Sequence, residues 1–145
     1  MVLDHHTLAI AIRWLHVAAM AMALGGALLV AWLAFREPAD RVVAVAVRYE
    51  QAFWLAAGVL VMTGVGNLGA FGTGLPQPGT GWGATFTTKL LLVALVIAGS
   101  LPRTLAVALP ALPALPSAAT LRALYAGTAV GLAAVAGLAV ALAHG

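Results

Sequence analysis

Four long apolar segments, separated by short connections, dominate the 145-residue chain. A helix needs about 20 apolar residues to cross roughly 30 Å of hydrocarbon, and each segment can supply most or all of that length. Hydrophobic residues make up 63% of the sequence and charged residues only 8%, whereas ordinary soluble domains contain about 25% charged residues. A soluble protein of this length has no interior that could hide so much apolar surface. We therefore predict an all-α, four-helix transmembrane bundle with up-down topology.

The apolar segments predict a single membrane domain over 1–145 with these spans: 8–35, 50–71, 86–109 and 121–143. Pro102 interrupts the third segment, where we expect a kinked helix, because neighbouring groups can satisfy the backbone atoms that proline frees. The first segment is not predicted to be a cleavable signal, since its apolar core is too long and its basic residues follow it. Before the fourth span, Pro110, Pro113 and Pro116 recur every third residue and predict an extended polyproline strap.

The arginines indicate an orientation. They lie in or beside the first and third connections, whereas the middle connection, 72–85, carries no charge. The positive-inside rule places the arginine-bearing connections in the cytoplasm, and both termini therefore on the outer, periplasmic or extracellular side. We expect a multi-pass protein of a bacterial-type plasma (inner) membrane with these residues at its cytoplasmic edge: Arg36, Arg41, Arg48, Arg103 and Arg122.

Aromatic and acidic residues fit the same arrangement. Trp14 and Trp82 are expected at the outer interface, and the inner aromatic belt is expected to contain Trp32, Tyr49, Trp54 and Tyr125. The carboxylates of Glu37, Asp40 and Glu50 are expected at the cytoplasmic edge, paired with Arg36, Arg41 and Arg48. No acid is then left at mid-membrane, where a proton-coupled transporter would need one.

His16 is the most informative single residue, because it and Arg13 are the only ionisable groups between residues 8 and 35. An ionisable side chain in lipid costs a few kcal/mol on insertion scales and usually marks a site. Arg13, His16 and Met20 follow the spacing i, i+3, i+7, so they share one helical face. Imidazole with thioether suits copper, and the same two groups serve as haem axial ligands. Alternatively, His16 hydrogen-bonds a neighbouring helix and Met20 fills space.

Three further polar residues are candidates for binding a cofactor in the outer half. Arg13 can extend to lipid phosphates or pair with a haem propionate or an anionic substrate. An arginine beside a bare copper ion is electrostatically unfavourable, and this favours haem. Lys89, at the start of the third span, can extend to the interface or balance a propionate, quinone or substrate oxygen. Asn67 can contribute a hydrogen bond between helices or to a cofactor.

Several chemistries lack the residues they need. The sequence contains no cysteine, which excludes disulfides and thiolate metal sites. It has no phosphate-binding glycine loop, no nucleophile elbow and no two-histidine zinc helix, so no catalytic residue is assigned. The net charge of +3 comes from a few connection arginines and does not indicate nucleic-acid binding.

Short motifs in the first three spans resemble those of the copper resistance D-like (CopD-like) membrane domain. They are Arg13-Trp14-Leu15-His16-Val17 followed by Gly25-Gly26, Arg48-Tyr49-Glu50 leading into Leu60-Val61-Met62-Thr63-Gly64, and Thr88-Lys89-Leu90-Leu91-Leu92-Val93. The same superfamily includes HemJ-type protoporphyrinogen oxidases, small helical proteins with a first-helix histidine linked to haem b. His16 and Lys89 are the residues at matching motif positions. The chain lacks methionine-rich outer loops, and it has Ile97-Ala98-Gly99-Ser100 where the HemJ-type proteins carry a tyrosine–histidine pair.

The resemblance implies outer-side copper handling in one branch and haem chemistry in the other. Our first hypothesis is a membrane protein that binds haem b or copper in the outer half of the bundle, for electron transfer or copper handling. The second is a non-catalytic accessory subunit of a larger, respiratory-type membrane complex, with no cofactor. The third is a HemJ-like porphyrinogen oxidase. The lipid bilayer is the expected environment in each case, with other membrane subunits or further copies of the chain as candidate partners.

Overall fold

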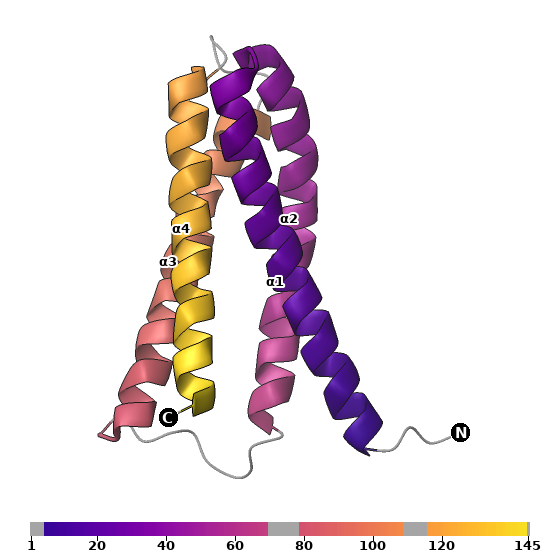
Figure 1. The fold of residues 1–145 in the computed structure, drawn as a ribbon, viewed down its shortest axis with the longest axis vertical. Coiled ribbons are helices and arrows are strands. Elements are labelled where there is room, and N and C mark those ends of the chain that lie inside the picture. The colour runs from indigo at the N-terminus through magenta and orange to yellow at the C-terminus, as the bar shows by residue number, and fades with distance from the viewer. Residues whose placement is uncertain (1–4, 70–78, 109–115, 145) are drawn as a thin grey trace.

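The computed structural model describes residues 5–69, 79–108 and 116–144, which contain four helices and no strand (Figure 1). The helices are α1 (His5–Arg36), α2 (Ala39–Gly69), α3 (Gly81–Ala108) and α4 (Ala118–His144). Each is long and apolar enough to cross a membrane. The predicted four-helix transmembrane bundle is therefore confirmed.

The helices run up and down, so the N- and C-termini lie at the same end of the bundle (Figure 1). We call this end the terminal end. At the opposite end α1 turns into α2 and α4 begins, and four of the arginines lie in these segments: Arg36, Arg41, Arg48 and Arg122. We call it the arginine end.

The start of α2 differs from the sequence prediction, which treated 36–49 as a connection. The connection is only a tight turn at Glu37 and Pro38, and the amide of Val42 already donates to the Pro38 carbonyl at 3.2 Å. Val42, Ala46 and Tyr49 recur at i, i+4, i+7 and are buried, whereas the charged residues Asp40, Arg41 and Arg48 are exposed. These charges lie on the half of the helix that faces away from the core, as in an amphipathic helix. The sequence prediction therefore took this part of the helix for a connection.

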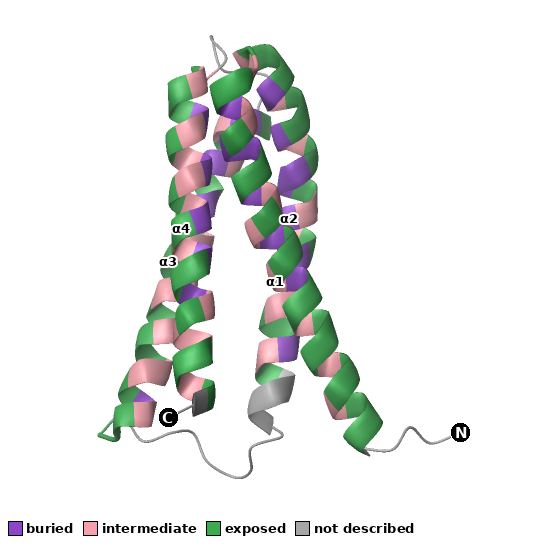
Figure 2. Ribbon diagram, in the orientation of Figure 1, coloured by how far each residue is buried: buried purple, intermediate pink, exposed green. Residues whose placement is uncertain are grey.

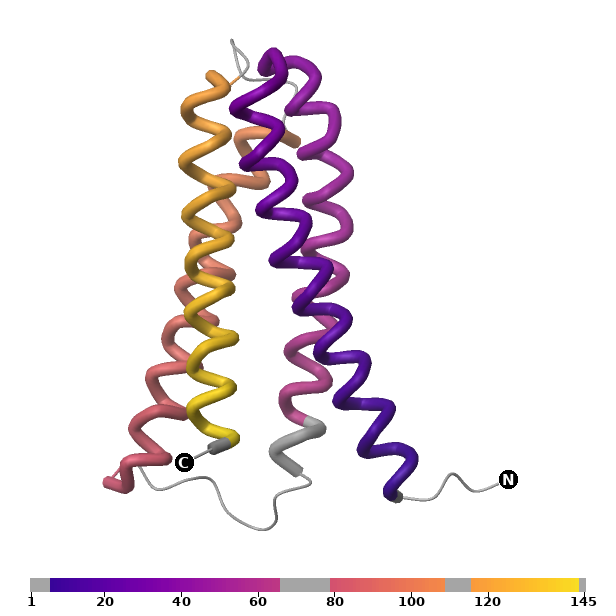
Figure 3. The backbone as a smooth tube through the Cα atoms, in the orientation of Figure 1, coloured from indigo at the N-terminus to yellow at the C-terminus, as the bar shows by residue number. Residues whose placement is uncertain are grey.

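The third helix continues through Pro102 to Ala108, as predicted. It bends in its last third, near the arginine end (Figure 3). Proline frees one carbonyl in the preceding turn and displaces the chain there, which accounts for a bend at this position. The predicted polyproline strap falls almost wholly outside the described residues.

Small side chains allow α1 to lie close to its neighbours. A stripe of alanines runs along the buried face of α1: Ala19, Ala23, Ala27, Ala31 and Ala34. Small residues at such a seam let helix backbones approach closely, which is the main source of packing energy in lipid. Gly26 beside this stripe accommodates an aromatic ring, since a Cβ there would lie 2.5 Å from Tyr49 Cδ2.

The core lies mainly in the half of the bundle near the arginine end (Figure 2). In that half α1 packs between α2 and α4, and α3 packs mainly on α4. Toward the terminal end the α1/α2 pair diverges from the α3/α4 pair (Figure 1). Over residues 81–99 of α3 only Gly83 is buried. The two helix pairs therefore pack against each other much less in the terminal half.

Candidate functional site

His16 lies in the terminal half of α1, and its half-buried ring faces α2. Its Nδ1 atom is 2.7 Å from the Thr63 hydroxyl oxygen. That hydroxyl also lies 2.6 Å from the Val59 carbonyl one turn earlier in α2. Threonine has a single hydroxyl proton, and a carbonyl can only accept, so Thr63 donates to Val59 and accepts from His16. The neutral ring therefore carries its proton on Nδ1 and a free lone pair on Nε2.

The surroundings of His16 combine a small residue with a cation. Gly64 lies beside the ring, and a Cβ there would make an ordinary contact of 3.8 Å with His16 Cε1. Lys89 on α3 lies within electrostatic range of His16. The half-buried lysine makes no ion pair or hydrogen bond with any described residue. The terminal half thus holds a histidine with an available lone pair on α1 and, on α3, a lysine whose charge acts on that histidine.

The other predicted site residues are placed differently. Arg13, one turn before His16, is exposed and has no ion pair with a described residue. A side chain that extends toward lipid phosphates would have the same surroundings. Met20 is half-buried and packs against the core. Asn67 lies in the last turn of α2, and its side chain falls outside the described residues. Lys89 therefore acts on His16 only through its charge, from a helix that does not pack on α1, and Arg13 lies at the surface.

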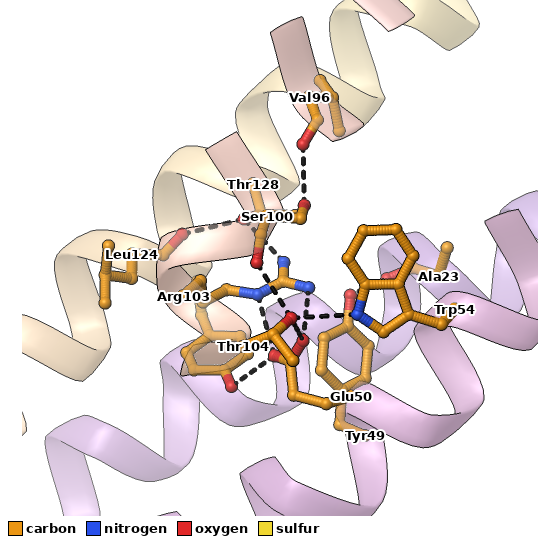
Figure 4. A network of polar contacts seen from close by, with 11 residues as sticks. Ala23, Tyr49, Glu50, Trp54, Val96, Ser100, Arg103, Thr104, Leu124 and Thr128 are labelled. Carbon is orange, nitrogen blue, oxygen red and sulfur yellow. Dashed lines mark hydrogen bonds and ion pairs between the residues drawn. The ribbon is translucent and has the colours of Figure 1, made fainter. Parts of the chain in front are cut away.

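A second polar region lies in the core near the arginine end, and the sequence analysis missed it (Figure 4). Arg103 on α3 is fully buried and donates to Glu50 on α2 through Nε at 2.8 Å and Nη2 at 3.0 Å. The same carboxylate accepts the Tyr125 hydroxyl at 2.7 Å and the Thr104 hydroxyl at 2.5 Å. We call the whole set the Glu50–Arg103 cluster; it comprises Glu50, Trp54, Arg103, Thr104, Tyr125 and Thr128.

The remaining contacts complete this cluster. Arg103 Nη1 donates to the Thr128 hydroxyl at 2.8 Å, and the Trp54 indole donates to Thr104 at 2.9 Å. The guanidinium carbon lies 4.3 Å from the centre of the Phe53 ring and 5.3 Å from that of Tyr49. Tyr49 in turn donates to the Ala23 carbonyl of α1 at 2.8 Å. All four helices are therefore joined by one polar and aromatic assembly.

Two expectations for this region were wrong. Glu50 does not pair with Arg48 at the membrane edge, and Arg103 does not lie at that edge but in the core. Glu50 stands eleven residues after Ala39, about 16 Å into the helix at 1.5 Å per residue. Glu50 also lies one turn from the buried Ala46 and Phe53, and Arg103 lies between the buried Ser100 and Val107. These spacings were visible in the sequence and place both charges on core-facing stripes.

The aromatic belt and the surface ion pairs were predicted in part. Tyr49 and Tyr125 are buried in the core, not at the interface. Trp14 and Trp32 are exposed, as belt residues should be. Glu37 does form a surface ion pair, but its partner is Arg41, with the N and O atoms 3.0 Å apart, and not Arg36. Asp40 has no ion pair with a described residue.

The two polar regions differ in what they can still bind. In the part of the chain that the structure describes, no fully buried side-chain polar atom lacks a partner, and both Glu50 oxygens already accept two hydrogen bonds each. His16 Nε2 has no such partner among those residues. His16 is therefore the better candidate for ligand chemistry. No family model, curated protein or solved structure matches this chain, so the assignment rests on the geometry of its own residues.

Proposed function

We propose that this protein binds haem b in the terminal half of its bundle, with His16 Nε2 as an axial ligand, for one-electron transfer. The observation that carries the proposal is the hydrogen bond between His16 and Thr63. It fixes the ring in the tautomer that leaves Nε2 free. Metal-bound histidines in proteins generally donate their other N–H to a fixed acceptor, which orients the ring and raises the basicity of the ligating nitrogen.

The donor set suits haem better than a bare copper ion. The residues that the structure describes include no group of three histidine, cysteine or carboxylate side chains that could hold a metal ion. Haem needs fewer protein ligands because its porphyrin supplies four nitrogens. Met20, one turn after His16, is the available soft ligand if copper binds instead.

Charge and packing around His16 support the same proposal. Lys89 has no carboxylate partner among the described residues, and a propionate would supply one. α3 does not pack on α1 and packs little on α2, and in the terminal half this leaves helix faces that an apolar macrocycle would cover. Gly64 beside the His16 ring leaves the histidine uncrowded on that side. When bound, haem would supply a one-electron redox centre; the protein contributes orientation, charge balance and an apolar environment.

The proposal is tested by purifying the protein from haem-supplemented cells and recording its absorption spectrum and metal content on the same sample. We expect a Soret band and about one haem per chain. His16→Ala should abolish the band, whereas His6→Ala should leave it unchanged. His6 is the matched control because it is an exposed histidine on the same helix.

Other results would overturn the proposal in distinct ways. Stoichiometric copper without a Soret band, lost in His16→Ala, would assign the site to copper. A wild-type protein that neither contains haem nor takes it up from added hemin would exclude haem binding. A Soret band that survives in His16→Ala would exclude His16 as the ligand.

A further inference from the structure

Two arginines at the arginine end rest on aromatic rings of α1. The guanidinium carbon of Arg122 on α4 lies 4.5 Å from the centre of the Phe35 ring. Arg36, the residue after Phe35, places its guanidinium carbon 5.9 Å from the Trp32 ring centre. Both rings belong to the last turns of α1, and the arginines over them come from α4 and from the end of α1. Both positive charges therefore lie where α1 ends and α4 begins.

Neither arginine forms an ion pair with a described residue. The ion pairs among the described residues are Arg41 with Glu37 and Arg103 with Glu50. Arg36 and Arg122 have only their aromatic contacts there. A ring face holds a guanidinium in place and leaves its N–H groups free to donate to an anion. The corner between α1 and α4 therefore presents two fixed cations that pair with none of the described carboxylates.

An apolar strip leads directly to these cations. Leu28, Trp32 and Phe35 follow the spacing i, i+4, i+7, and each exposes at least half of its surface. They therefore form one exposed line along the last turns of α1. In a membrane this line faces acyl chains, and the arginines at its end reach the depth of the lipid phosphates.

We propose that this corner is a binding site for an anionic phospholipid, whose phosphodiester is held by Arg36 and Arg122 while its acyl chain lies along Leu28, Trp32 and Phe35. Basic clusters between transmembrane helices at the membrane surface are suited to anionic headgroups. The exposed apolar strip favours a lipid over a free phosphate, because a free phosphate gains nothing from it. The site is independent of His16 and of any cofactor.

The test is native mass spectrometry of the delipidated protein with equimolar phosphatidylglycerol and phosphatidylcholine that have the same acyl chains. We expect the wild-type protein to retain mainly phosphatidylglycerol. Arg36→Gln/Arg122→Gln should reduce that preference by about fivefold per arginine removed. Arg41→Gln/Arg48→Gln is the matched control, because it removes two charges from the same end and should keep the preference.

A second variant separates the rings from the charges. Phe35→Leu keeps both arginines but removes the ring under Arg122, and we expect an intermediate loss of preference. Equal losses in the two double variants would overturn the site, because charge alone would then explain retention. Equal binding of the two lipids by the wild type would also overturn it, as would displacement by glycerol 3-phosphate at the same concentration as the lipid.

Discussion

The two polar regions inside the bundle differ in how much of their hydrogen-bonding capacity the protein itself uses. Near the arginine end, Glu50 accepts four hydrogen bonds and the Arg103 guanidinium is enclosed by aromatic rings. Near the terminal end, His16 has one hydrogen bond to Thr63 and a free lone pair. Both regions place ionisable groups where lipid makes them costly. The first region is saturated by contacts within the protein, and the second retains capacity for a ligand.

This difference follows the packing of the helices. The saturated cluster takes side chains from α2, α3 and α4 and reaches α1 through Tyr49. The His16 pair joins only α1 and α2, where α3 and α4 have diverged (Figure 1). We infer that the cluster holds the helices together at one end and so allows the other end to pack loosely. Three substitutions test this division of roles, in order of decreasing effect on stability.

The largest effect is expected when one charge of the Glu50–Arg103 pair is removed. Arg103→Met should lower the free energy of unfolding by about 3–5 kcal/mol, because Glu50 is left buried without its partner. Glu50→Leu/Arg103→Met should recover part of this loss and remain about 1–3 kcal/mol below the wild type, since the Tyr125 hydroxyl then lacks its acceptor. Unfolding in mixed micelles, followed by circular dichroism, measures both changes.

Arg48→Met is the control for that experiment, because Arg48 is an exposed arginine on the same helix as Glu50. It should change stability by less than about 0.5 kcal/mol. If the double variant were no more stable than Arg103→Met, the unpaired charge of Glu50 would not be the cause of the stability loss.

A smaller effect is expected where α1 meets the cluster. A Cβ at position 26 would lie 2.5 Å from two ring carbons of Tyr49, whereas nothing lies within 4 Å of one at Gly25. The Tyr49 ring cannot move freely, because its hydroxyl is bonded to Ala23 and it packs on Tyr125 with ring centres 5.6 Å apart. Gly26→Ala should therefore cost about 1–3 kcal/mol through overpacking.

Gly25→Ala supplies the comparison at the neighbouring residue and should leave the free energy of unfolding unchanged or slightly raised, since alanine favours the helix. Both variants can be measured in the same unfolding assay. Equal effects at the two positions would mean that α1 is not tied to the cluster through Tyr49.

The sequence predicted the architecture well because length and apolar content alone decide membrane spans. It also singled out His16 as needing a polar partner or a ligand, and the structure gives it a polar partner, Thr63. It failed for Glu50 and Arg103, because charges close to a predicted helix end are normally assigned to the surface. Glu50 became interior when α2 began at Ala39, and Arg103 because its side chain turns into the core from the part of α3 that continues past Pro102.

The partners of the polar residues could not be predicted, because they depend on how the helices rotate against one another. Thr63 and Val59 together fix the tautomer of His16, yet Thr63 lies 47 residues from it in sequence. Tyr125 lies 75 residues from Glu50. No local pattern encodes such contacts, and one chain alone cannot show which positions vary together.

The smallest effect on stability is expected at the His16 site, where Thr63→Val removes the hydroxyl and keeps the shape of the side chain. The loss of one hydrogen bond between membrane helices should cost about 1 kcal/mol. Haem affinity, if haem binds as proposed, should fall about 10–100-fold, because the ring is no longer held in the ligating tautomer. Thr63→Ser keeps the hydroxyl and should behave like the wild type in both measurements.

A stability loss in Thr63→Val as large as that of Arg103→Met would show that the terminal half is as tightly held as the cluster, and would remove the distinction between the two regions. A Thr63→Val protein with unchanged stability and reduced hemin affinity would instead sharpen it, because Thr63 would then serve the ligand and not the fold.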